Sequence, residues 1–183
     1  GRPDGRNRYY TDRQYENVWA SGTSEWLQDS YLDVDQRAGY FQVACSSAPA
    51  MVMRTLGAGS KYPVAYRDAA GEFLNGSSTY RLHLPPNPPA ALFWAVTAYN
   101  ITDGTMVEAP QLMPSINGFN KVATNSDGSV DIWFGPSKPA GAPDSNFIQT
   151  VDGRNFLVAL RLYGTGVEFF DQSWKPDDVA KLN

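Results

Sequence analysis

Cysteine and histidine are almost absent from this chain of 183 residues, which holds one of each. The single cysteine, Cys45, excludes an internal disulfide and a zinc site built from several cysteines. The single histidine, His83, excludes a site with several histidine ligands, and we expect no metal and no cofactor. Cys45 stands in the apolar sequence "YFQVACSSAP" without a nearby basic residue, so we expect a buried, inert thiol.

Charge is also scarce, because Asp, Glu, Lys and Arg make up only 19% of the residues. The formal net charge is −4 and no basic cluster is present, so nucleic acid is not an expected partner. The surface must therefore be rich in Ser, Thr, Asn, Gln and Gly, which is common in extracytoplasmic β proteins. We accordingly expect a periplasmic or secreted location.

Long apolar runs are missing as well, and none approaches the roughly 20 residues that a membrane-spanning helix needs. No membrane span is expected. The chain begins "GRPDG", without a methionine or a signal peptide, which suggests a piece of a longer protein. Hydrophobic residues reach 42%, and the length is sufficient for one domain with a substantial core.

Residues 1–60 are predicted to be a helical lead-in that packs on the rest of the chain. Tyr15, Val18 and Trp19 have the i, i+3, i+4 spacing of one helix face within residues 11–32. A second helix is expected to begin at Asp33 or Asp35, with an apolar stripe that includes Ala38, Phe41 and Cys45.

From Lys61 onward the hydrophobic period changes to two, which predicts strands. The runs "LFWAVTAYN" (92–100) and "NFLVALRLYG" (155–164) are almost continuously apolar, as expected of central strands. Their predicted core residues are Trp94, Val96, Leu160 and Leu162. Residues 61–183 are therefore predicted to form a mainly β domain, an antiparallel, jelly-roll-like β-sandwich behind the helical segment. The whole chain is expected to be one structural domain.

One long stretch resembles a known family. Residues 66–107 read "YRDAAGEFLNGSSTYRLHLPPNPPAALFWAVTAYNITDGTMV", with a turn, an Asn-Gly-x-x-x-Tyr-x-Leu strand, a Pro-Pro pair and an aromatic strand. Later segments, "SDGSVDIWFGPSKP", "FLVALRLYG" and "SWKPDDV", follow in the same order. This pattern is similar to domain of unknown function 1214, from about Trp26 to the end.

The resemblance implies a fold and a context, but no reaction. Members of that family are usually the C-terminal half of bacterial proteins, many of them exported, whose N-terminal half is domain of unknown function 1254. The resemblance therefore implies that the protein's own N-terminal domain is a partner. Ala95 and Asn100 depart from the serine and aspartate usual in the family.

Strand alternation places charged and aromatic residues on a second face of three predicted strands. If these strands share a sheet, that face is a candidate ligand site, because aromatic rings suit sugars or aromatic ligands and arginines suit carboxylates. Arg81, His83, Trp133, Arg161 and Tyr163 are the candidate ligand-binding residues, with Asp131 beside them. The alternative is a half-solvated outer face on which Arg81 or Arg161 pairs with Asp131 or Glu168.

Structural roles are favoured for the other polar candidates. Asp68, Asp103 and Asp127 occupy turn sequences, where aspartate is expected to bond the local backbone. Asn146 is expected either to bond loop backbone or to contact a ligand. A Ser-His-Asp system would need His83, and the chain has no G-x-S-x-G sequence.

Three functions remain open from the sequence, and whether the protein is an enzyme is undecided among them. The first is a β-sandwich module of a bacterial envelope or exported protein that binds a small or saccharide-like ligand, or completes a site with a missing N-terminal half. The second is a hydrolase-type enzyme with its site between the two halves. The third is a structural or assembly domain, which forms a homo-oligomer.

Overall fold

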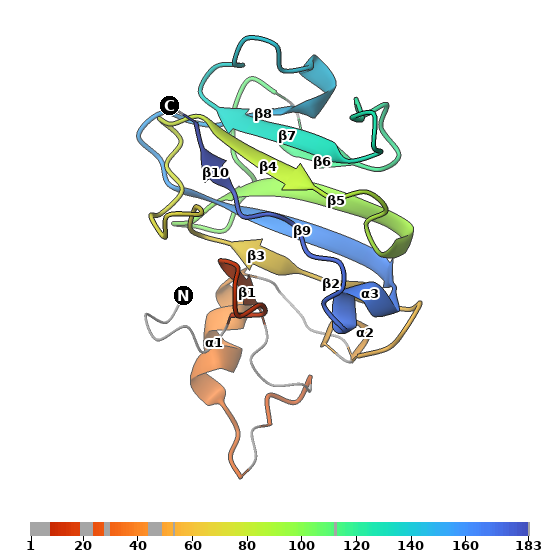
Figure 1. Cartoon of the computed structure of the whole chain (residues 1–183). Coiled ribbons are helices and arrows are strands. Elements are labelled where there is room, and N and C mark those ends of the chain that lie inside the picture. The colour runs from red at the N-terminus through yellow and green to blue at the C-terminus, as the bar shows by residue number, and fades with distance from the viewer. Residues whose placement is uncertain are drawn as a thin grey trace.

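The computed structural model describes residues 8–18, 24–27, 30–43, 49–52, 54–111 and 113–182. They form a mainly β structure in which two sheets pack face to face (Figure 1). Every paired strand is antiparallel to its neighbour except β8, which runs parallel to β7.

The larger sheet has the strand order β1-β3-β9-β5-β6, and β2 also pairs with β9. Nine residue pairs join β5 to β9, which is the longest strand pairing in this sheet. The strand bounds are Tyr15–Asn17 (β1), Ser60–Lys61 (β2), Pro63–Ala65 (β3), Ala90–Asn100 (β5), Ser115–Asn117 (β6) and Phe156–Thr165 (β9).

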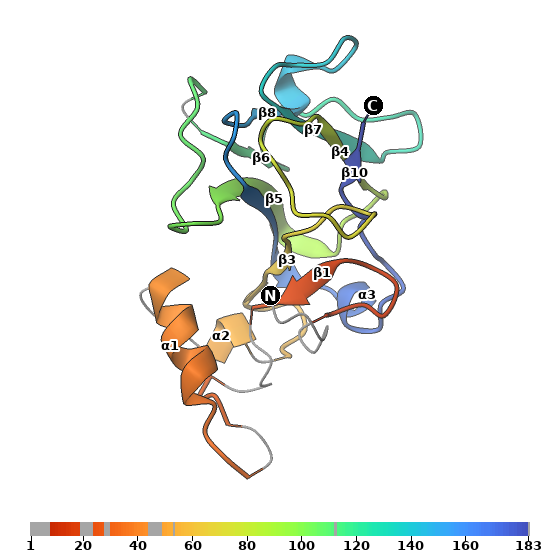
Figure 2. The same ribbon diagram turned by 90° about the vertical axis from the view of Figure 1, so that its left-hand side faces the viewer.

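The smaller sheet has the order β10-β4-β7-β8. Its strand bounds are Tyr80–Leu84 (β4), Val130–Gly135 (β7), Phe147–Gln149 (β8) and Ala180–Lys181 (β10). The described helices are short: Val34–Val43 (α1), Pro49–Val52 (α2), Val167–Phe170 (α3) and the 3₁₀ turn Asp144–Asn146. Figure 2 shows α1 and α2 on the side of the larger sheet that faces away from the smaller sheet.

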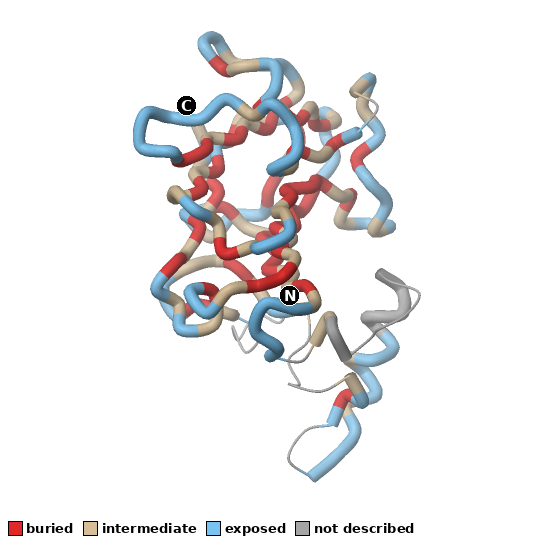
Figure 3. Tube along the Cα trace, turned by 90° about the vertical axis from the view of Figure 1, so that its right-hand side faces the viewer, coloured by how far each residue is buried: buried red, intermediate tan, exposed pale blue. Residues whose placement is uncertain are grey.

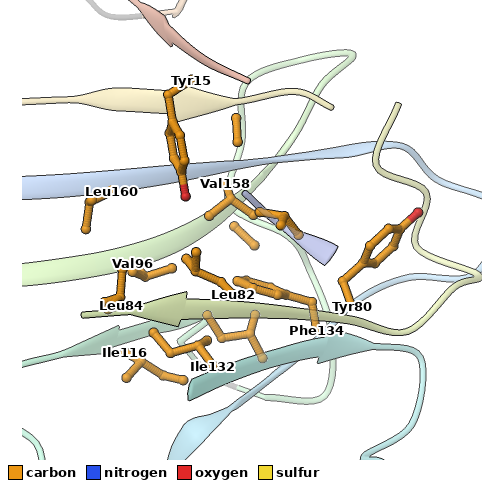
Figure 4. Packing of buried hydrophobic residues seen from close by; sticks show 14 of the residues in the cluster. Tyr15, Tyr80, Leu82, Leu84, Val96, Ile116, Ile132, Phe134, Val158 and Leu160 are labelled. Atoms are coloured by element: carbon orange, nitrogen blue, oxygen red, sulfur yellow. The ribbon is translucent and has the colours of Figure 1, made fainter. Parts of the chain in front are cut away.

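The core fills the space between the two sheets (Figures 3 and 4). Leu82, Ile132 and Phe134 point into it from the smaller sheet, and Val96 and Leu160 point into it from the larger one. All five are fully buried. Strand alternation therefore sends one side of each sheet inward and leaves the other side as an outer face.

The predicted core is confirmed at three positions and partly at the fourth. Val96, Leu160 and Leu162 have no exposed surface. Trp94 is half-buried and packs against the edge of the core. Its ring lies over Gly118, where a Cβ atom would come within 3.0 Å of the indole nitrogen.

The prediction of a helix over residues 11–32 is wrong for its described part. Residues 15–17 form β1, which pairs with β3, and the Tyr15 side chain is fully buried in the core. The Tyr15 hydroxyl donates to the Asp177 carbonyl at 3.1 Å. Trp26 has a φ of 62°, a left-handed conformation that no α-helix can contain. Trp19 lies outside the described residues.

The second predicted helix is α1, and it begins directly after Asp33. The Asp33 carboxylate accepts the Gln36 backbone N–H at 3.0 Å, as an N-cap residue does. The apolar stripe is not buried at its first positions, because Val34 is 58% exposed and Ala38 is exposed. The Phe41 side chain and Cys45 lie outside the described residues.

The N-terminal residues are tied to the C-terminal arm. The Asp178 carboxylate accepts the Gln14 backbone N–H at 2.7 Å, and Arg13 donates to the Pro176 carbonyl at 3.2 Å. The Tyr9 and Phe169 rings stack with centroids 4.6 Å apart. These contacts explain why Tyr15 enters the sheet as a strand, because the arm supplies partners that a local helix would not have.

Replacing Leu160 with Ala should lower the free energy of unfolding by about 2–5 kcal/mol, because it opens a cavity at the centre of the core. Denaturant unfolding measures this loss. The matched control is Val167→Ala, because Val167 is 47% exposed and its truncation should change stability by about 0.5 kcal/mol or less. Equal effects of the two substitutions would contradict the strand register.

Candidate functional site

Four of the predicted site residues gather on the outer face of the smaller sheet. The β4–β7 register places Arg81 opposite Trp133 and His83 opposite Asp131. We call Arg81, His83, Asp131 and Trp133 the Asp131 patch. His83 lies one residue before the end of β4, where Pro85 and Pro86 follow, as predicted for a strand that ends at prolines.

The carboxylate at the centre of this patch is already fully engaged. His83 Nδ1 lies 2.9 Å from Asp131 Oδ1, and Asn125 Nδ2 donates to Asp131 Oδ2 at 3.0 Å. Arg81 Nε lies 3.9 Å from Asp131 Oδ1, an ion pair between partly exposed side chains. The expected pairing of Arg81 with Asp131 is thus confirmed, and His83 is held by the same carboxylate. The patch joins β4 to β7 across their outer face.

The pKa of the Asp131 carboxyl reflects two opposing effects. Burial raises this pKa, but hydrogen bonds from Asn125 and His83 and the positive charge of Arg81 outweigh burial, so the pKa lies below its ordinary value. Asp131 therefore stays ionised at neutral pH and acts as the common acceptor of the patch.

Arg161 and Tyr163 lie elsewhere, so the expectation of one shared face is wrong. They belong to β9, which pairs with β5, β3 and β2 in the larger sheet. The core separates the outer face of that sheet from the Asp131 patch (Figure 1). Strand alternation correctly predicts that Arg161 and Tyr163 point away from the core, but it cannot show which strands are neighbours.

Arg161 and Tyr163 have their own neighbours on the outer face of the larger sheet. Tyr163 lies opposite Phe93, Arg161 lies opposite Ala95, and Ala95 lies opposite Asn117 on β6. Tyr62, which follows β2, and Phe119, which follows β6, complete the group. We call it the Arg161 patch: Tyr62, Phe93, Asn117, Phe119, Arg161 and Tyr163.

The rings of the Arg161 patch are closely associated. Phe93 stacks on Tyr163 with centroids 4.2 Å apart and an interplanar angle of 12°, and Phe119 lies 5.1 Å from Phe93. Tyr62 meets Tyr163 edge-on at 6.2 Å, and its hydroxyl accepts a hydrogen bond of 2.6 Å from the Ser60 hydroxyl. Phe119 is 75% exposed. The patch therefore presents a partly exposed aromatic surface.

Arg161 lies beside two of these rings, the Tyr62–Tyr163 pair. Its Cζ atom is 5.6 Å from the Tyr62 ring and 5.7 Å from the Tyr163 ring, distances typical of cation–π interaction. Across the described part of the chain, no carboxylate pairs with Arg161 and no oxygen accepts a hydrogen bond from it; the expected alternative partners, Asp131 and Glu168, are not used. A half-buried guanidinium thus keeps its N–H donors available.

Tyr163 does not oppose this positive charge. Burial raises the pKa of the Tyr163 hydroxyl to about 12, and the neighbouring Tyr62 hydroxyl adds to the increase. Tyr163 is therefore neutral at physiological pH. With Tyr163 neutral, Arg161 is the only charged member of the Arg161 patch, which is cationic in a chain whose formal net charge is −4.

The remaining polar candidates have structural roles. Asn146 is buried: it exchanges hydrogen bonds with the Ala123 backbone at 2.9 and 2.8 Å and donates to the Asp131 carbonyl at 2.8 Å. Asp68, Asp103 and Asp127 each accept backbone N–H groups of their own turns at 2.9–3.0 Å. The predicted backbone role is confirmed for all four residues.

A separate pocket of about 450 Å³ lies where β5 ends and β9 begins. Residues 100–103 and 153–155 line it, and none of the five predicted ligand-binding residues does. Within the described ranges, no three His, Cys, Asp or Glu side chains are placed to hold a metal ion. None of the described helices is long and apolar enough to cross a membrane.

Sequence reasoning missed Tyr62, Phe93, Asn117 and Phe119. Phe93 was detectable, because it has the same strand parity as Ala95 and Thr97 in a strand whose other face is the core. Tyr62 and Phe119 stand just outside their strands, and Asn117 is on a strand of three residues that no periodicity reveals. Only the fold brings these residues beside Arg161.

Comparison with known proteins shows the family. Residues 59–167, more than half of the chain, match the family described as protein of unknown function (DUF1214). The chain belongs to this family. The match extends from β2 to the start of α3, so it contains both patches. None of the curated proteins is detectably similar to the chain in sequence.

Two solved structures were compared with this DUF1214 chain. The VPA0106 protein of Vibrio parahaemolyticus has a TM-score of 0.65 at 18% identity, over 91% of this chain and 41% of that chain. An uncharacterized protein from Burkholderia cenocepacia has a TM-score of 0.44 at 16% identity, over 90% of this chain and 47% of that one. The first likeness shows the fold alone, and the chain spans less than half of the VPA0106 protein.

Replacing Asp131 with Asn should reduce the acid sensitivity of the fold. Because the folded-state pKa of Asp131 lies below its unfolded value of 3.8, ionised Asp131 stabilises the fold above about pH 4. This stabilisation is lost as the pH falls through the lowered folded-state pKa. Urea unfolding from about pH 5 to about pH 2.5 should show a shallower decline for the variant.

The control for this pH series is Asp152→Asn, because Asp152 is exposed in a turn. Its decline of stability with falling pH should match that of the wild type. The assigned role of Asp131 is contradicted if the Asp131→Asn variant loses stability as steeply as the wild type.

Proposed function

We propose that this chain is a ligand-binding module, a jelly-roll-like β-sandwich, of an exported or envelope bacterial protein. Its ligand is a small or saccharide-like molecule, and its site is the outer face of the larger sheet at the Arg161 patch. The other part of the site is supplied by the protein's own N-terminal domain when the module belongs to a longer polypeptide.

The observation that carries this proposal is the state of Arg161. A half-buried guanidinium without a protein acceptor loses hydration and gains no ion pair, which is costly unless another group binds it. Structural arginines avoid this cost by pairing, as Arg81 does with Asp131. Arg161 instead lies beside two tyrosine rings. A free, oriented donor beside stacked rings is typical of a binding site.

The length of the VPA0106 protein supports the role of a module. The part of the VPA0106 chain that matches this fold is 41% of its length, so there the fold is one part of a longer polypeptide. The Arg161 patch and its surroundings include exposed apolar residues, since Phe119 in the patch is 75% exposed and Leu92, next to Phe93 in the chain, is 67% exposed. We propose that a further domain covers them. A second copy of the chain, in a homo-oligomer, is the alternative cover.

Replacing Arg161 with Leu should abolish ligand binding and leave the fold intact. A screen of sugars, sugar acids and aromatic acids by ligand-observed NMR first identifies what the wild type binds. Binding of those compounds to Arg161→Leu should fall at least about tenfold. Arg81→Leu is the matched control, because Arg81 is already paired, and it should bind as the wild type does.

Two results would contradict the location of the site: equal binding by wild type and Arg161→Leu, or loss of binding in Arg81→Leu alone. Thermal unfolding of each variant shows whether it is folded. If the single chain binds no compound, the same screen on the longer polypeptide distinguishes a shared site from none. Sedimentation of the wild type reports whether the chain forms a homo-oligomer.

A hydrolase-type enzyme is the second candidate, favoured by one observation. The hydrogen bond between His83 and Asp131 is the contact that orients a general base in Ser-His-Asp enzymes. The geometry also explains this bond without catalysis, because His83 and Asp131 are directly opposite each other on β4 and β7 and such pairs stabilise sheets.

Replacing His83 with Ala distinguishes the two roles of this residue. We expect unchanged ligand binding and a modest loss of stability, of about 1 kcal/mol, because Asp131 loses one hydrogen-bond partner. A turnover screen with esters and glycosides compares the wild type and the variant. Hydrolysis by the wild type that disappears in His83→Ala would overturn this expectation and favour the enzyme.

A further inference from the structure

The Arg161 patch specifies the chemistry of its ligand, and this inference rests on the proposed function. We infer that the ligand is a six-membered ring that carries a carboxylate, with the carboxylate on Arg161 and Asn117 and the ring against Phe93 and Phe119. Two sources share this chemistry, the sugar acids and the aromatic acids. Neutral sugars and simple ringless anions lack one of the two features.

The carboxylate half of the inference follows from how Arg161 is held. The Tyr62 and Tyr163 rings lie 5.6 and 5.7 Å from Arg161 Cζ and only 6.2 Å from each other, so both rings contact the guanidinium from one side. The guanidinium is therefore open on the side away from both rings, and its N–H groups form a planar fork there that matches two carboxylate oxygens. The Ser60 hydroxyl holds Tyr62, so one of the two rings is held in place.

Asn117 provides a second donor on the same line of paired residues across the sheet, which runs from Arg161 through Ala95 to Asn117. Its Oδ1 atom accepts the Phe119 and Asn120 backbone N–H groups at 3.0 and 3.2 Å, so the amide cannot turn without losing both bonds. The Nδ2 group is therefore the free end, and no oxygen of the described residues accepts from it. Arg161 and Asn117 are two strand spacings apart, roughly 10 Å between backbones, on either side of Ala95.

The expectation that the ligand carries a ring follows from the next outward-facing residue pair, Tyr163 and Phe93. Residues two positions apart on a strand are about 7 Å apart on the same face, so Tyr163 and Phe93 lie next to the line from Arg161 to Asn117. Phe119 extends the stack of rings outward and is 75% exposed, so its face is available. A ring on this surface and an acidic group on Arg161 are separated by a distance that one small molecule spans.

Charge on the patch gives the sign of the ligand. Along the chain, the acidic residue that follows Tyr163 is Glu168. It lies in α3, after the end of β9, and it pairs with no described basic residue. Asp131, the partner of Arg81, lies beyond the core on the other sheet. An anion therefore meets one cation and one amide donor, with no carboxylate among the six patch residues to repel it.

The test compares matched ligands on the wild-type chain by calorimetry and ligand-observed NMR. Galacturonate is set against galactose, phenylacetate against phenylacetamide, and acetate serves as the carboxylate without a ring. We expect at least one ring carboxylate to bind at least about tenfold more tightly than its neutral counterpart and than acetate. Preference for galacturonate identifies a sugar-acid site, and preference for phenylacetate identifies an aromatic-acid site.

A substitution at Asn117 tests the carboxylate contact directly. Asn117→Asp keeps the oxygen that accepts the two turn N–H groups, but replaces the free donor with a negative oxygen. Binding of ring carboxylates should fall at least about tenfold, while any weak binding of the neutral counterparts should stay unchanged. Arg161→Lys keeps the charge but loses the fork, so we expect affinity between that of wild type and Arg161→Leu.

The outcomes separate this inference from the proposed function. If a neutral ring binds as tightly as its carboxylate and Arg161→Leu still removes binding, the carboxylate inference is overturned and the site stands. Equal binding of acetate overturns the role of the rings. If none of the five compounds binds to the wild type, or Asn117→Asp, shown by thermal unfolding to be folded, binds ring carboxylates like the wild type, the inference is likewise overturned.

Discussion

The antiparallel ladder between β5 and β9 is the constraint on which the rest of the structure depends. Its register sends Val96, Leu160 and their even-numbered neighbours into the core and turns Arg161 and Tyr163 outward. A slip of one residue would exchange the two sets and bury the Arg161 guanidinium among apolar side chains. The same pairing that makes the core therefore builds the floor of the proposed site.

The outer faces of the two sheets, each of which carries an arginine, differ in how their charges are balanced. On the smaller sheet, Asp131 gathers Arg81, His83 and Asn125, so the group is complete within the chain. On the larger sheet, Arg161 has two tyrosine rings beside it and no acceptor among the described residues. Charged side chains that are paired with each other stabilise the sheet, whereas a guanidinium without a protein acceptor can form its hydrogen bonds with a ligand.

The sequence predicted the parts of the fold that local periodicity controls. The two central strands, the inward residues Leu160 and Leu162, and the Asp127-Gly128 turn follow from alternation and turn chemistry, and the turn glycine has a φ of 84°. Residues 15–17 were predicted as a helix, because the Tyr15 spacing fits one. Their strand depends on contacts with the distant C-terminal arm, such as the Tyr15–Asp177 hydrogen bond.

The sequence predicted which individual residues face outward, but it did not predict which of them lie together on one face. Alternation identified outward Arg81, His83, Arg161 and Tyr163, yet strand order assigns them to two opposite faces. Strand order depends on long-range pairing, which a single sequence does not encode in any local pattern. For the same reason Phe119, beyond the end of a strand of three residues, could be placed beside Phe93 only by the fold.

The central claim is that Arg161 is an unpaired donor that binds an anionic ring, and its own N–H resonance tests this most directly. In protein labelled with ¹⁵N-arginine, the account predicts that a ring carboxylate such as galacturonate or phenylacetate shifts the Nε–Hε signal of Arg161, assigned with Arg161→Lys. The signal of Arg81, already beside Asp131, should stay in place. An Arg161 signal that no ring carboxylate moves, or equal shifts of both signals, would contradict the account.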